Sequence, residues 1–143
     1  MIKILALDID GVLTDGRVTV DENGRELKTI SYRDVDAVFE AHRRDLRVVL
    51  VTGEDSEWVK MIATKLAIKH LYSGAKDKFQ GLQRLCADLG VEFAEVCYVG
   101  DSTRDIEAIV RAGLGFAPAD ASTGARGAHS ERKEAGTHSP VEV

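Results

Sequence analysis

Short apolar segments alternate with segments of helical periodicity along most of the chain. Four apolar segments have the pattern of strands, at residues 2–7, 46–51, 96–99 and 114–117, and a further short strand is expected at residues 69–72. Between them, apolar residues recur three and four positions apart, which predicts amphipathic helices. Strands that alternate with helices through short connections form a parallel sheet with helices on both faces. We therefore expect an α/β fold of three layers around a Rossmann-like parallel sheet.

Residues at the ends of the expected helices fit the preferences of helix caps. Carboxylate and hydroxyl side chains accept hydrogen bonds from the first turn, and glycine favours the left-handed backbone that ends a helix. The expected N-caps are Asp34 for the first helix and either Asp55 or Ser56 for the second. A further helix is expected from Asp77 to Leu89, with Gly90 as its stop.

A β-hairpin is predicted within residues 17–31, after the first strand. Two segments of alternating polarity flank Asn23-Gly24, a pair that favours the tight turn of a hairpin. A two-stranded hairpin is only marginally stable alone in water, so this one should pack on its own domain or on another subunit. We expect it to be an oligomer contact.

One domain accounts for most of the chain. The sequence has 143 residues, of which 44% are apolar, and this suits a single core. We assign residues 1–118 to the core and residues 119–143, which contain few large apolar side chains, to a partly irregular tail. The formal charge of −5 argues against nucleic acid or an anionic membrane as the partner.

Other features of the sequence favour a cytoplasmic protein. No apolar run approaches the span of a bilayer, and the first residues do not have the layout of a secretory signal. Cys86 and Cys97 lie in apolar stretches without metal-ligand spacing, so we expect buried thiols in a reducing compartment. His42 is expected to be half-buried on a helix.

The polar residues that follow the predicted strands are expected to meet. In an open parallel sheet the carboxyl ends of the strands share one edge, and ligands bind at that edge. A single polar turn between a strand and a loop would explain one acidic pair, but not groups from four separate connections. The residues expected around this crevice are Asp8, Asp10, Thr52, Lys78, Asp101 and Asp105.

Each of these residue types has a use in phosphoryl transfer. Asp8, Asp101 and Asp105 offer hard oxygen ligands suited to Mg²⁺. An ionised Asp8 can attack phosphorus, while Asp10 can donate a proton to the leaving alkoxide and later activate water. A hydroxyl donor and a compact cation can stabilise the phosphoryl oxygens, and these would come from Thr52 and Lys78.

Four motifs in this order resemble those of the haloacid dehalogenase superfamily of phosphohydrolases. They are Asp8-Ile9-Asp10-Gly11-Val12-Leu13-Thr14-Asp15-Gly16, Val51-Thr52-Gly53, Asp77-Lys78 and Gly100-Asp101-Ser102-Thr103-Arg104-Asp105. Within the superfamily the chain looks most like the small capless sugar-acid phosphatases that act on 3-deoxy-octulosonate phosphate or on keto-deoxynonulosonate phosphate. It is also similar to the phosphatase-like tail domain of acylneuraminate cytidylyltransferases.

The resemblance implies a mechanism and an assembly. It implies Mg²⁺ as cofactor, an aspartyl-phosphate intermediate at Asp8, Asp10 as acid and base, and phosphate contacts from Thr52 and Lys78. Members of the family form a tetramer in which the hairpins pack together, so the resemblance also implies a homotetramer. The implied metal ligands are Asp8, Asp10 through its backbone oxygen and Asp101, with Asp105 in support.

The spacing of the motifs independently indicates a phosphatase without a cap domain. Only the hairpin fits between Asp8 and the helix before Thr52, and only one helix and a short strand separate Thr52 from Lys78. An open site admits water freely, so a neighbouring subunit should supply the missing wall.

Substrate preference depends on the residues around the Thr52-Gly53 pair. Members of the family that act on nonulosonate phosphates carry a glutamate after Thr-Gly and a lysine one helix later, and Glu54 and Lys65 occupy these positions. Members that act on octulosonate phosphates tend to carry arginine after Thr-Gly. The resemblance thus favours a nonulosonate 9-phosphate, with an octulosonate 8-phosphate as the alternative. Glu54 can also be an acid favoured at a helix start, and Lys65 a solvated side chain.

Two departures from the family pattern bear on these expectations. The glycine-rich C-terminal segment of the family is represented only by residues 136–142, without its usual arginine, which weakens the expected contact with a neighbouring site. Ser102 replaces the second acid of a common Gly-Asp-Asp, so we expect looser Mg²⁺ binding. His129 and His138 do not have the spacing of metal ligands.

Two other functions fit parts of the sequence. A non-catalytic, phosphatase-like oligomerisation module would carry degenerate motifs, whereas the motifs here are intact. A phospho-receiver domain shares the parallel sheet and an Asp/Thr/Lys trio, but it needs a phosphorylated aspartate that Val51-Thr52-Gly53 does not supply. The sequence therefore favours an enzyme, a phosphoric monoester hydrolase.

Overall fold

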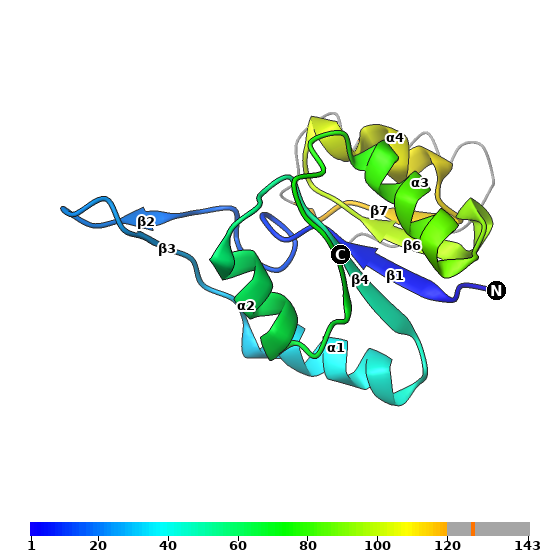
Figure 1. Ribbon diagram of the computed structural model, residues 1–143, viewed down its shortest axis with the longest axis horizontal. Helices are drawn as coiled ribbons and strands as arrows, with labels where there is room; N and C mark the ends of the chain where they lie inside the picture. The colour runs from blue at the N-terminus through cyan, green and yellow to red at the C-terminus, as the bar shows by residue number, and fades with distance from the viewer. Residues whose placement is uncertain (120–126, 128–143) are drawn as a thin grey trace.

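A five-stranded parallel sheet lies at the centre of the structure, a computed structural model that describes residues 1–119 and 127 (Figure 1). The strand order is β5-β4-β1-β6-β7, and all neighbouring strands pair in parallel. The expected α/β fold is confirmed. The strands are β1 (Ile4–Leu7), β4 (Arg47–Val51), β5 (His70–Tyr72), β6 (Val96–Val99) and β7 (Leu114–Phe116).

Helices cover both faces of this sheet (Figure 1). After β1 the chain moves outward to β4 and β5 with α1 (Tyr32–Arg43) and α2 (Glu57–Lys65) on one face. It then returns past β1 to β6 and β7 with α3 (Lys78–Leu89) and α4 (Ile106–Arg111) on the other face. Two short 3₁₀ turns, η1 (Phe93–Glu95) and η2 (Thr103–Asp105), precede β6 and α4. Strand β1 is therefore central, at the point where the direction of the connections reverses.

Alternate residues of the strands contribute to two separate cores. In β4, Val49 and Val51 pack on the side of α3 and α4, whereas Val48 and Leu50 pack on the side of α1 and α2. Each of these four side chains is at most 2% exposed. A strand buried on both faces needs apolar residues throughout, which is why the segment has no polar alternation. Burial of each such side chain contributes roughly 1.5–3 kcal/mol.

Helix α1 begins earlier than the sequence indicated. The prediction of Asp34 as its N-cap was wrong, because Ser31 occupies that position and its hydroxyl accepts a hydrogen bond from the backbone N–H of Arg33. Both residue types cap well, and the extended backbone at Ser31 (φ −90°, ψ 138°) is the conformation that a cap requires. Asp34 lies in the first turn, where the helix dipole favours a carboxylate.

The other helix ends agree with the sequence. Ser56, one of the two candidates, caps α2 through a hydrogen bond to the backbone N–H of Val59. The carboxylate of Asp77 caps α3, and Gly90 ends this helix in the left-handed conformation.

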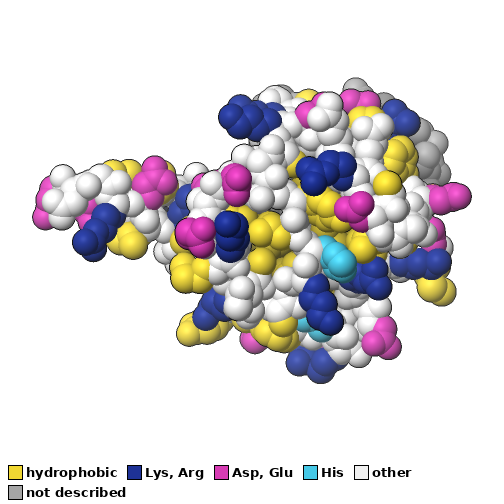
Figure 2. All heavy atoms as spheres, viewed as in Figure 1, with side chains coloured by type: hydrophobic (Ala, Val, Ile, Leu, Met, Phe, Trp, Pro, Cys, Tyr) yellow, Lys and Arg dark blue, Asp and Glu magenta, His cyan; other side chains and the backbone are white. Residues whose placement is uncertain are grey.

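The predicted hairpin is confirmed, with shorter strands than the alternating pattern indicated. Strands β2 (Thr19–Val20) and β3 (Glu26–Leu27) pair antiparallel, and the carboxylate of Asp21 accepts hydrogen bonds from the backbone of Asn23 and Arg25 in the turn. The hairpin projects as an arm from the body of the domain (Figure 1). Apolar side chains lie exposed along this arm in Figure 2, and they include Val18, Val20 and Leu27.

The two cysteines and His42 lie as the sequence indicated. Cys86 and Cys97 are buried thiols, and His42 is half-buried, with its Nε2 atom 2.9 Å from the backbone oxygen of Leu66. Among the described residues, no helix is both long enough and apolar enough to cross a membrane. The C-terminal segment 136–142, His129 and His138 lie outside the described residues. The domain boundary after residue 118 stays a prediction.

Candidate active site

The carboxyl ends of β1, β4 and β6 meet at one cavity of about 290 Å³. Strands β4 and β6 flank β1, so the residues that follow these three strands converge, as the topology predicts. The lining residues are Asp8, Asp10, Gly16, Thr52, Gly53, Glu54, Lys78, Asp101, Ser102 and Arg104. Asp105 lies beneath this surface and is fully buried.

A buried lysine links two of the aspartates. The Nζ atom of Lys78, the first residue of α3, lies 3.0 Å from Oδ1 of Asp8 and 3.2 Å from Oδ1 of Asp105. None of the three residues is more than 6% exposed. A buried ammonium group needs charged partners, because its desolvation is otherwise too costly. These ion pairs explain why a cation is placed in the first turn of a helix, where the helix dipole disfavours it.

Asp105 is held by neutral donors as well as by Lys78. The hydroxyl of Tyr98 donates to its Oδ1 atom at 2.6 Å, and the backbone N–H and hydroxyl of Ser102 donate to its Oδ2 atom at 3.2 and 3.1 Å. Burial, followed by the charge of Asp105, raises the pKa of Tyr98 well above its usual value, so Tyr98 stays a donor. Asp105 thus fixes the turn that carries Asp101.

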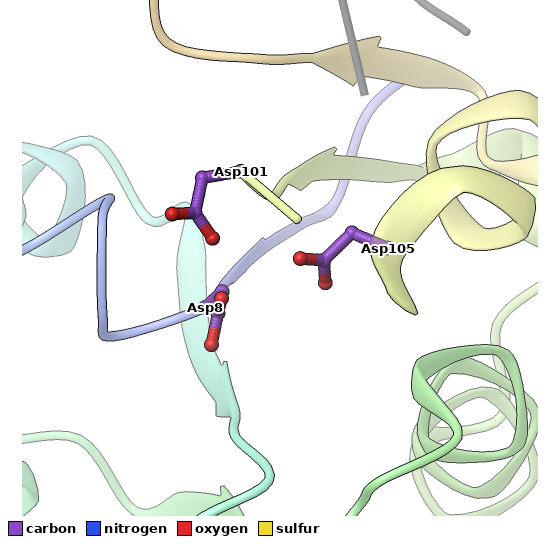
Figure 3. Close-up of side chains that lie close together, drawn as sticks. All are labelled: Asp8, Asp101 and Asp105. Carbon is purple, nitrogen blue, oxygen red and sulfur yellow. The ribbon is translucent and has the colours of Figure 1, made fainter. Parts of the chain in front are cut away.

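Three carboxylates point toward a common centre (Figure 3). One oxygen each of Asp8, Asp101 and Asp105 lies within 4.8 Å of the others. Burial raises the pKa of Asp8 to about 7, the Lys78 ammonium opposes this rise, and the charge of Asp105 adds to it. Burial is also the main cause of the raised pKa of Asp101. When ionised, the three carboxylates carry more negative charge than the Lys78 ammonium offsets.

Two glycines of the motifs allow this close approach. Gly11 has a φ of +83°, and a Cβ atom at this position would lie 1.7 Å from Oδ2 of Asp101. A Cβ atom on Gly100 would lie 2.4 Å from the Cβ and Cγ atoms of Asp105. Any larger residue at either position would push an acidic side chain out of the cluster.

A lysine that the sequence did not indicate contacts Asp10. The Nζ atom of Lys28, which follows β3, lies 3.1 Å from both carboxylate oxygens of Asp10 and 2.8 Å from Oε1 of Glu54. It also lies 5.0 Å from the ring centre of Trp58, in a cation–π contact. Burial lowers the pKa of Lys28, but the bonds to Glu54 and Asp10 outweigh this effect and leave the pKa raised.

Glu54 is already engaged in this network. It accepts hydrogen bonds from Lys28 and from the hydroxyl of Ser56 at 2.6 Å, and these two bonds lower its pKa. Its backbone N–H donates to the hydroxyl oxygen of Thr52 at 3.2 Å, which leaves the Thr52 hydrogen free to donate into the cavity. Lys65, the other expected substrate-binding residue, is the exposed last residue of α2 and does not line the cavity.

Comparisons with known proteins place this geometry in a family. The profile of the haloacid dehalogenase-like hydrolases matches residues 25–113. The chain is 37% identical over 120 residues to the 3-deoxy-D-manno-octulosonate 8-phosphate phosphatase of Escherichia coli strain K12, a match that covers 84% of this chain and 64% of that protein. The phosphatase of the same name from Yersinia pestis is 34% identical with the same coverage. The chain therefore spans less than two-thirds of the length of these curated relatives.

Solved structures agree in fold and in sequence. The 3-deoxy-D-manno-octulosonate 8-phosphate phosphatase of Moraxella catarrhalis, in complex with magnesium, phosphate and the sugar acid, superposes with a TM-score of 0.84 at 30% identity. That match covers 89% of this chain and 73% of the other. A probable phosphatase from Pseudomonas syringae gives a TM-score of 0.84 at 36% identity over 88% of this chain and 72% of the other. The chain belongs to the haloacid dehalogenase-like hydrolase family.

Proposed function

We propose that this chain is a Mg²⁺-dependent phosphomonoesterase that acts on a phosphorylated 2-keto-3-deoxy sugar acid through an aspartyl-phosphate intermediate. The observation that carries the proposal is the buried contact of Lys78 with Asp8, in one cavity with Thr52 and Asp101. This set combines a nucleophile, phosphoryl-oxygen donors and metal ligands. The names of the relatives support a sugar-acid phosphate as the substrate class.

The residues divide into roles by position. Asp8 attacks phosphorus and forms the acyl phosphate while the bond from phosphorus to the sugar oxygen breaks, and Asp10 gives this oxygen its proton. A water molecule then attacks phosphorus, gives its proton to Asp10 and releases Asp8 as the free carboxylate. The contacts of Lys28 with both oxygens of Asp10 orient this side chain toward the cavity that it lines.

Two donors are placed to stabilise the transferring group. Lys78 is held 3.0 Å from the nucleophile, so its charge lies beside the oxygens that become more negative in the transition state. The hydroxyl of Thr52, 2% exposed, donates from the neighbouring strand. Because both groups are fixed before substrate arrives, little reorganisation is needed during the reaction.

The donor set fits Mg²⁺. This ion prefers hard oxygen ligands and retains several waters, and the three carboxylates within 4.8 Å supply an excess of negative charge that a divalent cation offsets. Asp8 and Asp101 would bind it directly with the backbone oxygen of Asp10, and Asp105 would support it through its bonds to Lys78 and Ser102. When bound, Mg²⁺ would neutralise charge on the phosphoryl oxygens.

Sugar acids of two chain lengths are candidate substrates. The relatives named above act on an eight-carbon substrate, 3-deoxy-D-manno-octulosonate 8-phosphate. Glu54 in the cavity lining supports the nine-carbon nonulosonate 9-phosphate that the sequence favoured. Lys65 does not line the cavity of its own chain, so its position does not support the nonulosonate substrate.

We also propose that the hairpin assembles the chain into a homotetramer. Val18, Val20 and Leu27 are 45%, 57% and 62% exposed on the projecting arm (Figure 2). An exposed apolar patch on a hairpin that is only marginally stable by itself favours a protein contact there. Burial of these side chains between copies would stabilise the arm and add a wall to the open cavity.

Replacement of the nucleophile tests the enzymatic proposal. With Mg²⁺ and a panel of sugar-acid, neutral sugar and aryl phosphates, the wild type should release phosphate, and Asp8→Asn should lower kcat by more than about 10³-fold because the amide cannot form the acyl phosphate. Asp36→Asn removes an exposed carboxylate of α1 and should leave kcat unchanged. Full activity of Asp8→Asn, or no phosphate release by the wild type from any compound, would contradict the proposal and favour a non-catalytic module.

The same variant should alter stability in a pH-dependent way. Asp8 has a pKa of about 7 in the folded chain and 3.8 as its ordinary value, so the folded state binds more protons between these values and loses stability as the pH rises. Without metal at pH 8, the free energy of unfolding of Asp8→Asn should therefore exceed that of the wild type by on the order of 2–4 kcal/mol. This difference should shrink toward pH 4. Denaturation in EDTA across this range measures it, and an unchanged difference would refute the assigned cause.

Light scattering tests the assembly. At micromolar concentration the wild type should have about four times the chain mass of 15.6 kDa, and Leu27→Asp should lower this mass because it buries a charge between arms. Tyr32→Asp, exposed but outside the hairpin, is the matched control and should stay tetrameric. A monomeric wild type would rule out the tetramer.

Glu54 can be tested by comparison of substrates. Glu54→Ala should raise KM for a nonulosonate 9-phosphate about tenfold, the effect of one lost charged hydrogen bond, and should scarcely change turnover of an aryl phosphate. Glu57→Ala removes an exposed acid from the same helix start and serves as the control. Equal effects on both substrates would mean that Glu54 acts through Lys28 and Asp10, not on the sugar.

A further inference from the structure

One arginine of the cavity has no acidic partner among the described residues. Arg104 belongs to η2, is exposed, and lines the cavity. Its Nη1 atom lies 3.9 Å from the position that a Cβ atom on Gly53 would occupy, so the guanidinium extends from the β6 side of the cavity toward the β4 side. Within the part of the chain that the structure describes, it makes no hydrogen bond, ion pair or ring contact.

Two other cations are already paired with the acidic residues of the cavity. Lys78 pairs with Asp8 and Asp105, and Lys28 pairs with Asp10 and Glu54. A substrate with two anionic groups would therefore meet a largely acidic wall, except at Arg104. Of the residues described around this cavity, Arg104 is the cation whose charge is available to a second anionic group.

The position of Arg104 separates it from the phosphoryl subsite. Asp8, Thr52 and Lys78, which would hold the phosphoryl group, are at most 6% exposed, whereas Arg104 lies on the exposed rim. A side chain on the rim reaches the part of the substrate that extends outward from the phosphoryl group. In a sugar acid that part carries a carboxylate, which matches the planar, two-donor geometry of a guanidinium.

Resting on the proposed function, we propose that Arg104 binds the carboxylate of the phosphorylated sugar acid. This contact makes the cavity select acidic over neutral sugar phosphates. Arg104 contributes to binding and to specificity and takes no part in the chemical step, because Asp8 and Asp10 supply the nucleophile and the proton.

Titration calorimetry with two probes tests this assignment without relying on turnover. The full chain with Mg²⁺ is titrated with free 3-deoxy-octulosonate, which has the carboxylate but no phosphate, and separately with inorganic phosphate. Arg104→Gln should raise the Kd of the sugar acid about tenfold and leave the Kd of phosphate unchanged. Arg104→Lys, which keeps the charge but not the paired donors, should give an intermediate Kd.

A second arginine provides the matched control. Arg47→Gln removes the same charge at the start of β4, at the opposite edge of the sheet, and should change neither Kd. With substrates, Arg104→Gln should raise KM for the sugar-acid phosphate about tenfold and leave kcat for an aryl phosphate unchanged.

The outcomes distinguish this proposal from the proposed function. An unchanged Kd of the sugar acid in Arg104→Gln overturns the role of Arg104, and so does an equal loss for phosphate, which would place the guanidinium at the phosphoryl subsite. A wild type that binds both probes but releases no phosphate from any substrate refutes the enzymatic function, while a selective loss of sugar-acid affinity in Arg104→Gln would still support the carboxylate subsite.

Discussion

The buried contact of Lys78 with Asp8 and Asp105 holds together the three parts of the chain that build the cavity. Asp8 follows β1, Lys78 begins α3 and Asp105 ends η2. One ion pair therefore joins the end of the central strand to α3, and the other joins α3 to the turn after β6. Water is largely excluded from these groups, which strengthens each interaction. Loss of Lys78 would leave the buried carboxylates of Asp8 and Asp105 without their cation, at a cost of about 3–5 kcal/mol. The arrangement that suits phosphoryl transfer is thus also a condition for folding of this edge of the sheet.

The cluster of Asp8, Asp101 and Asp105 suits metal binding but lowers the stability of the metal-free chain. Asp101 joins Asp8 and Asp105, and one ammonium cannot neutralise three carboxylates. Burial is the main cause of the raised pKa values of Asp8 and Asp101, and the charge of Asp105 adds to both. Gly11 and Gly100 allow the carboxylates to approach one another, because each lacks the Cβ atom that would keep a carboxylate away. A divalent cation would relieve the repulsion. Folded sites of this kind are built for a bound ion, not for the stability of the bare chain.

Site residues whose positions follow from the strand order could be predicted from the sequence. Contacts that depend on the direction of a side chain could not. Asp8, Thr52 and Asp101 each follow an apolar strand, so the strand order alone brings them together. The contact of Lys28 with Asp10 depends on how the hairpin leaves the sheet, which no local pattern determines. Ser31 and Asp34 are both good caps, and only the backbone after the hairpin decides between them. Lys65 was paired with Glu54 by its spacing of one helix, but the nine residues of α2 put its two ends about 12 Å apart.

A cavity without a cap domain must obtain its selectivity and its closure from the rim. On one side, Lys28 reaches from the hairpin to Asp10 and Glu54, and on the other side Arg104 has no acidic partner within residues 1–119. The hairpin that supplies Lys28 also exposes Val20 and Leu27, the side chains proposed to bury between copies. Since Lys28 directly follows Leu27, any contact that fixes the arm also fixes the ammonium that orients Asp10. Assembly through the hairpin would therefore act on Asp10, the proposed acid and base, and not only on access to the cavity.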